Sequence, residues 1–125
     1  MRILIAEDND SKYQMILDCL TNEFGVYLEV KGFTYAKGVV LELMNNEYVF
    51  LIQDMQMPLD SDGRIDASAG SYVFSQLNRR QIKIKTICCS SEEVDLSKFP
   101  NYKSVLFSYS GCSWKEDLIN KMKNY

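Results

Sequence analysis

The chain has 125 residues, of which 46% are hydrophobic, so it is long enough for one domain with a substantial core. Its formal net charge of −3 argues against a nucleic-acid partner, because few basic groups would be free to neutralise phosphates. Histidine is absent and the four cysteines form no Cys-x-x-Cys pair, which excludes histidine-based triads and argues against a structural zinc site.

The first residues are basic and then apolar, like the start of a signal peptide. Three acidic residues, Glu7, Asp8 and Asp10, end this run well short of the usual apolar region of such a peptide. No other apolar run approaches the roughly 20 residues that are needed to cross a bilayer. We therefore expect a cytoplasmic protein without a membrane partner.

Short apolar runs alternate with segments whose apolar residues recur at helical spacing. The predicted strands cover residues 2–6, 26–30, 48–52, 82–89 and 104–109. The predicted helices follow a cap at Asp10 or Ser11 and then cover residues 35–45, 70–78 and 114–122. Between the last two strands, residues 91–103 contain Pro100, so we expect short turns there in place of a full helix.

Alternation of this kind predicts an α/β fold, with a parallel sheet, right-handed crossovers and helices on both faces. In the flavodoxin-like form, a doubly wound five-stranded parallel sheet with strand order 2-1-3-4-5, the ligand site lies beyond the carboxyl ends of strands 1 and 3. We expect one such domain over residues 1–125, with the fourth helix short or missing and no output domain.

Carboxylates follow both of these strands. Glu7 and Asp8 come directly after the first strand, and Asp54 comes after the third. A single acidic residue in such a place often does no more than cap a helix, but the combination at two adjacent strand ends is more specific. Three close carboxylates repel one another unless a cation intervenes, and a hard divalent ion such as Mg²⁺ suits oxygen ligands.

Three segments resemble the response-regulator receiver domain of two-component systems, the CheY-like family. They are residues 3–10 (ILIAEDND), residues 51–58 (LIQDMQMP) and residues 86–91 (TICCSS). The first is similar to the apolar strand and acidic pair of receivers, the second to the phosphoacceptor motif, and the third to the fourth strand with its terminal hydroxyl. The resemblance extends over nearly the whole chain, in the same order.

The resemblance implies a role for each residue. Asp54 would accept the phosphoryl group, and Glu7, Asp8, Asp54 and the backbone carbonyl of Gln56 would hold Mg²⁺. Ser90 would donate a hydrogen bond to the phosphoryl group as the switch hydroxyl. It also implies a histidine kinase or phosphotransfer protein as donor and a downstream protein partner. We expect no enzymatic activity beyond phosphorylation and dephosphorylation of the chain's own aspartate.

The chain departs from the receiver pattern in two ways. Receivers have a lysine followed by proline at the end of the fifth strand, whereas residues 107–112 here are FSYSGC. The loop before Gly70 is also long, at residues 59–69, and its Arg64 is one candidate to replace the missing cation. The resemblance is therefore to an atypical single-domain form that lacks the strand-5 lysine.

Three functions remain open at this point. The complete acidic cluster favours a stand-alone receiver that is phosphorylated on Asp54 in a phosphorelay. The missing lysine favours a pseudo-receiver, which would bind protein partners without phosphorylation. A metal-dependent phosphohydrolase or Toprim-type nuclease would usually have a second acidic residue at position 56, where this chain has Gln56.

Overall fold

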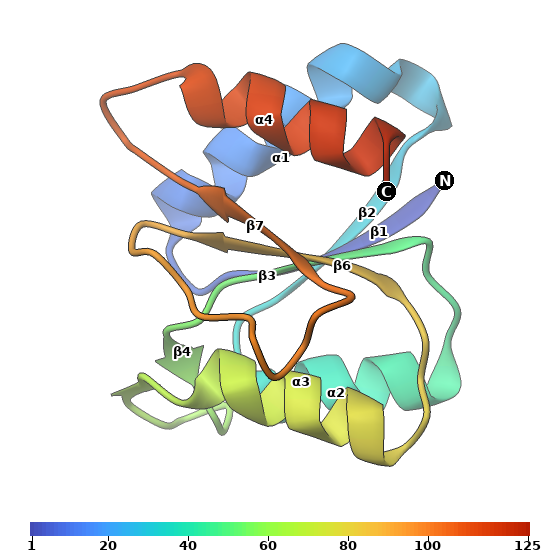
Figure 1. Ribbon diagram of the computed structural model, residues 1–125, viewed down its shortest axis with the longest axis vertical. Helices are drawn as coiled ribbons and strands as arrows, with labels where there is room; N and C mark the ends of the chain where they lie inside the picture. The colour runs from blue at the N-terminus through green and yellow to red at the C-terminus, as the bar shows by residue number, and fades with distance from the viewer.

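The computed structural model describes residues 1–125 and contains a five-stranded parallel sheet in the order β2-β1-β3-β6-β7. Numbered along the sheet's own strands, this is the predicted order 2-1-3-4-5, so the flavodoxin-like fold class is confirmed (Figure 1). The strands are β1 (Arg2–Ala6), β2 (Glu29–Phe33), β3 (Phe50–Gln53), β6 (Lys85–Ser90) and β7 (Lys103–Leu106).

Helices cover both faces of the sheet, as Figure 1 shows, with α1 and α4 on one side and α2 and α3 on the other. The helices are α1 (Asp10–Phe24), α2 (Ala36–Asn45), α3 (Ala69–Arg79) and α4 (Ser113–Lys123). Because side chains alternate along a strand, β1 contributes Ile3 and Ile5 to the core on the α1 side and Leu4 to the core on the α2 side. Burial on both faces explains why the central strands are continuous apolar runs.

The strand register brings three chain positions to one edge of the sheet. Ala6 of β1 is paired with Gln53 of β3, and Gln53 is paired with Cys88 of β6. In parallel strands the following residues continue side by side, so the ends of β1, β3 and β6 meet at this edge. The predicted functional residues occupy these strand ends.

Two predicted boundaries near α1 are wrong. The cap of α1 is Asn9, whose side chain accepts a hydrogen bond from the backbone N–H of Lys12, rather than Asp10 or Ser11. The second strand begins three residues later than predicted, because a 3-10 turn (Gly25–Tyr27) follows α1. Gly25 has φ = 63°, a left-handed conformation that glycine adopts without a steric penalty.

Two connections are irregular. In the long loop after β3, β4 (Met57–Pro58) and β5 (Ile65–Asp66) form a short antiparallel hairpin that the sequence did not predict. Residues 91–102 form no helix, as expected from the sequence, and Figure 1 shows them descending from β6 beside α3. They are held there by aromatic contacts, because Phe99 and Tyr102 both pack edge-on against Phe74 of α3.

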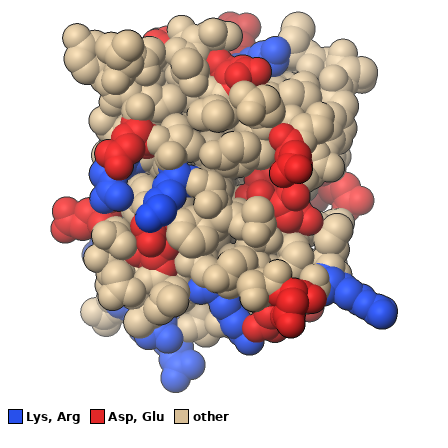
Figure 2. Space-filling model, turned by 180° about the vertical axis from the view of Figure 1, so that it is seen from behind, with Lys and Arg blue, Asp and Glu red and all other residues tan.

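The surface agrees with the charge balance. On the face seen in Figure 2, acidic and basic side chains are interspersed and form no broad basic patch. All four cysteines are free, and Cys88 and Cys89 are buried within β6. None of the helices has the length and apolar character that a membrane span requires.

Candidate functional site

The ends of β1, β3 and β6 surround a hollow of about 250 Å³. The structure brings all the predicted site residues to it, namely Glu7, Asp8, Asp54, Gln56 and Ser90. The remaining lining residues are Asn9, Lys12, Ile65, Ser91, Glu92 and Tyr109. Ile65 belongs to the β4–β5 hairpin, so the long loop contributes one wall of the hollow.

The acidic cluster is compact. One carboxylate oxygen from each of Glu7, Asp8 and Asp54 lies within 4.8 Å of the others. The pKa of Glu7 is raised to about 7, mainly by burial, with Lys12 opposing the shift and Asp54 adding to it. Burial also raises the pKa of Asp8, again with a contribution from Asp54. Both shifts arise mainly because burial disfavours the charged carboxylates, and repulsion from Asp54 adds to them.

Asp54 is held by one of its two oxygens. Its Oδ1 accepts a hydrogen bond of 2.8 Å from the backbone N–H of Met55 and lies 3.1 Å from Nζ of Lys12. Its backbone N–H donates to the carbonyl of Ala6, which fixes the main chain at the end of β3. Its Oδ2 accepts no hydrogen bond from the protein, so one oxygen is positioned while the other is available for chemistry.

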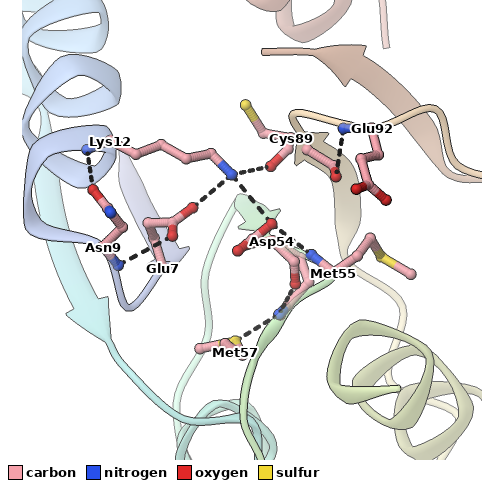
Figure 3. Close-up of polar contacts among 10 residues, drawn as sticks. Glu7, Asn9, Lys12, Asp54, Met55, Met57, Cys89 and Glu92 are labelled. Carbon is pink, nitrogen blue, oxygen red and sulfur yellow. Dashed lines mark hydrogen bonds and ion pairs between the residues drawn. The ribbon is translucent and has the colours of Figure 1, made fainter. Parts of the chain in front are cut away.

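Lys12 is the functional candidate that the sequence analysis missed. Figure 3 shows its side chain extending from α1 between Glu7, Asp54 and the carbonyl of Cys89. The residue is only 4% exposed. Burial opposes the charged form, but Glu7 and Asp54 outweigh this effect, so the pKa of Lys12 is raised and its ammonium stays charged.

A sequence signal for Lys12 was present. The buried positions of α1 are Lys12, Ile16, Cys19 and Leu20, spaced as the inward face of one helix. A lysine on the apolar face of a helix is unusual, because lysine is rarely buried without a charged partner. The acidic residues just before the helix supply that partner.

Ser90 ends β6 beside the acidic cluster and is 5% exposed. Its Oγ accepts a hydrogen bond of 3.2 Å from the backbone N–H of Glu92, which ties the hydroxyl to the first turn of the irregular segment. The hydroxyl hydrogen is free to donate elsewhere. Ser90 can therefore donate a hydrogen bond into the hollow while its oxygen holds the start of residues 91–102.

At the end of β7, apolar and hydroxyl groups replace the lysine of the receiver pattern. Phe107 is buried at 2% exposure, and its ring centroid lies 5.3 Å from Nζ of Lys12. Tyr109 lines the hollow, whereas Ser108 is exposed and does not. Arg64 is exposed and lies outside the hollow's lining, so the structure does not support it as the replacement cation.

The residues present fit a hard divalent cation. Glu7 Oε1 is buried and accepts no aligned hydrogen bond, although it lies 2.7 Å from the ammonium of Lys12 as an ion pair. This buried oxygen, which accepts no aligned hydrogen bond, lies close to two other carboxylates. Mg²⁺ prefers oxygen ligands of this kind. Glu7, Asp8 and Asp54 would provide the side-chain ligands, and Gln56 lines the same hollow.

We expect Mg²⁺ to bind weakly at this cluster, because Lys12 already neutralises part of the acidic charge. Titration of the ¹⁵N-labelled protein should shift the amide signals of residues 7–9 and 54–56. Asp54→Asn should reduce these shifts, whereas Asp62→Asn, in the exposed part of the long loop, should not. An unchanged wild-type spectrum at millimolar Mg²⁺ would remove the metal from this site.

A parallel sheet in this order, with the acidic cluster beyond β1 and β3, is the arrangement found in response-regulator receivers. Over nearly its whole length the chain is similar to the Detocs response regulatory protein DtcB of Enterobacter cloacae (strain JD6301), with 26% identity over an alignment of 147 positions, gaps included, that covers 98% of each protein. No family model matches the sequence.

Solved structures agree on the fold. The response regulatory domain of mrkE from Klebsiella pneumoniae has a TM-score of 0.74 and 17% identity, covering 99% of this chain and 93% of that one. The response regulator TrrA from Thermotoga maritima, in complex with Mg²⁺ and BeF, has a TM-score of 0.71 and 20% identity, covering 96% of this chain and 97% of that one. TrrA is also solved in complex with the histidine kinase ThkA. The resemblance to CheY-like receivers is thus confirmed.

Proposed function

We propose that the chain works as a receiver in phosphorelay signalling and accepts a phosphoryl group on Asp54. The observation that carries this proposal is how the two oxygens of the Asp54 carboxylate are held. Its Oδ1 is held by a hydrogen bond from Met55 and an ion pair with Lys12, and its Oδ2 is free, at the end of β3 and within an acidic cluster. The BeF complex of TrrA, a protein with the same fold, supports it.

In the proposed transfer, Oδ2 of Asp54 attacks the phosphorus of the donor and forms a new P–O bond. The bond between phosphorus and the donor's leaving atom breaks, and its electron pair leaves with that atom, which takes up a proton where it needs one. The product is an acyl phosphate on Asp54. The Ser90 hydroxyl then donates a hydrogen bond to a phosphoryl oxygen. Mg²⁺, when bound, supplies positive charge that offsets the charge of the phosphoryl group.

A histidine kinase or a phosphotransfer protein is the proposed donor, and the complex between TrrA and the histidine kinase ThkA supports this class of partner. The phosphorylated domain would then act on a downstream protein. Residues 91–102 follow Ser90 and form no helix, and the Ser90 hydroxyl holds their first turn. We propose that they form part of the surface this partner contacts.

The second candidate is a pseudo-receiver that binds its partner without phosphorylation. The ion pair between Lys12 and Asp54 favours it, because the paired state already satisfies part of the charge on the acceptor carboxylate. Here the buried cluster would serve to hold the strand ends together.

Incubation with acetyl phosphate and Mg²⁺, followed by intact mass measurement, separates the two candidates. The receiver is expected to gain the mass of one phosphoryl group. The adduct should be stable in acid and lost in base, as an acyl phosphate is. A protein that binds Mg²⁺ but never gains the adduct, from acetyl phosphate or from a range of phosphorylated histidine donors, would be a pseudo-receiver.

A further inference from the structure

We propose that the ammonium of Lys12, delivered from helix α1, is the cation that pairs with the phosphoryl group on Asp54, in place of a lysine at the end of β7. This inference rests on the proposed function and names the residue that completes its site. It assigns a chemical role to a buried charge that lies outside the three segments that resemble receivers.

The ammonium lies where three strand ends meet. Its Nζ is 2.7 Å from Glu7 Oε1 after β1, 3.1 Å from Asp54 Oδ1 after β3, and 2.8 Å from the carbonyl oxygen of Cys89 in β6 (Figure 3). The contact with the Cys89 carbonyl is a hydrogen bond, and the contacts with Glu7 and Asp54 are ion pairs. The base of the side chain is fixed as well, because the backbone N–H of Lys12 donates to the capping oxygen of Asn9. The charge is therefore held in one place.

No other cation reaches the hollow. Lys12 is the one basic residue among those that line it. Lys115, the first lysine after β7, lies over the ring of Trp114. The buried ring of Phe107 lies beside the ammonium, so a cation that enters from α1 is packed against the β7 end rather than supplied by it. Lys12 can therefore take the role of the missing strand-5 lysine, although it comes from a different part of the sequence.

On phosphorylation, the contact of the Lys12 ammonium would move from the Asp54 carboxylate to the phosphoryl group attached to it. The free carboxylate of Asp54 carries one negative charge, whereas the acyl phosphate has a neutral carbonyl oxygen and about two negative charges on the phosphoryl group. The ammonium would lose an ionised partner at Oδ1 and gain stronger acceptors on the same side chain. The carboxylate of Glu7, 2.7 Å from Nζ, remains as its second partner.

The third contact links the ammonium to the rest of the molecule. Cys89 directly precedes Ser90, and Ser90 holds the first turn of the irregular segment through Glu92. A movement of the ammonium toward the phosphoryl group pulls on the carbonyl of Cys89 while Ser90 turns its hydroxyl to the same group. Both motions act on the end of β6, from which residues 91–102 begin.

The test uses beryllofluoride with Mg²⁺ as the phosphoryl mimic and measures its affinity by ¹⁹F NMR. Lys12→Gln is expected to weaken binding roughly ten- to hundredfold, the loss of one charge-assisted hydrogen bond, and Lys12→Arg should recover part of it. Adding Tyr109→Lys to Lys12→Gln should restore affinity, since position 109 lines the hollow. Adding Ser108→Lys is the matched control and should not, because position 108 is exposed and does not line the hollow.

A second measurement needs no substitution in the sample. In wild-type protein with ¹³C-labelled lysine, the ε-carbon signal of Lys12, assigned by its absence in Lys12→Arg, should shift on addition of beryllofluoride, while that of Lys115 should not. This decides the question if Lys12→Gln does not fold. Equal affinity of wild type and Lys12→Gln, or an unmoved Lys12 signal in a saturated complex, would overturn the inference and leave the proposed function standing. A wild type that binds no beryllofluoride would overturn both.

Discussion

Asp54→Asn is expected to abolish the phosphoryl adduct, whereas Asp8→Asn should only slow its formation. The amide of asparagine is not a nucleophile toward phosphorus, so loss of Oδ2 as a carboxylate oxygen removes the acceptor itself. Asp8 contributes charge to the acidic cluster but is not held by the donors that position Asp54. Its loss should therefore weaken Mg²⁺ binding, and raising the Mg²⁺ concentration should restore part of the rate.

The measurement is the time course of intact mass with acetyl phosphate at low and high Mg²⁺. Asp62→Asn is the matched control, because Asp62 is an exposed aspartate in the long loop and outside the hollow. It should be phosphorylated as the wild type is. An adduct that persists in Asp54→Asn would place the acceptor elsewhere, with Asp8 as the first residue to map by peptide analysis.

The strand ends were predictable because two simple patterns specify them. A continuous apolar run that stops at Asp54 identifies a central strand, and the alternation of strands and helices places its carboxyl end beside Glu7 and Asp8. The parallel register then aligns the ends of these strands, because it is set by the buried strands and not by the residues of the site. Ser90 follows in the same way from the end of β6.

Lys12 was not predicted because its role depends on tertiary distance. The helical pattern gives the face on which it lies, but the reach of its side chain to Asp54, 42 positions later in the sequence, depends on how α1 packs across the sheet. The end of β7 carries no charged residue, and Arg64 of the long loop lies outside the hollow. Only the fold brings a residue of the first helix to the place of a strand-5 residue.

The β4–β5 hairpin could not be predicted from the sequence either. Its strands have two residues each and carry no periodic pattern, so nothing marks them in a polar loop. Gly70 shows what fixes the far end of this loop. A β-carbon at Gly70 would come within 2.8 Å of the α-carbon of Met55, the residue after Asp54. The start of α3 thus packs directly against the acceptor loop, a contact that no local rule reveals.

Phe74→Ala should be the most destabilising substitution on the α3 side and should loosen residues 91–102. Phe74 is fully buried, and its ring contacts Phe99 and Tyr102 at centroid distances of 5.3 and 4.9 Å. Truncating a buried phenylalanine costs about 3–5 kcal/mol, because it removes buried apolar surface and leaves a cavity. That is a large part of the roughly 5–15 kcal/mol that stabilises an ordinary domain.

The effect on residues 91–102 follows from how they are held. They form no helix, so no ladder of backbone hydrogen bonds keeps them in place, and their apolar side chains pack against the core beneath α3. Without the ring of Phe74, amide hydrogen exchange in this segment should rise more than the global loss of stability explains. Urea unfolding measures the change in the global free energy of unfolding. Leu41→Ala, on the exposed side of α2, is the control and should change that free energy by no more than about 0.5 kcal/mol. Exchange that rises only in proportion to global stability would show that Phe99 and Tyr102 stay anchored without Phe74, and that the segment after Ser90 is held by some other contact.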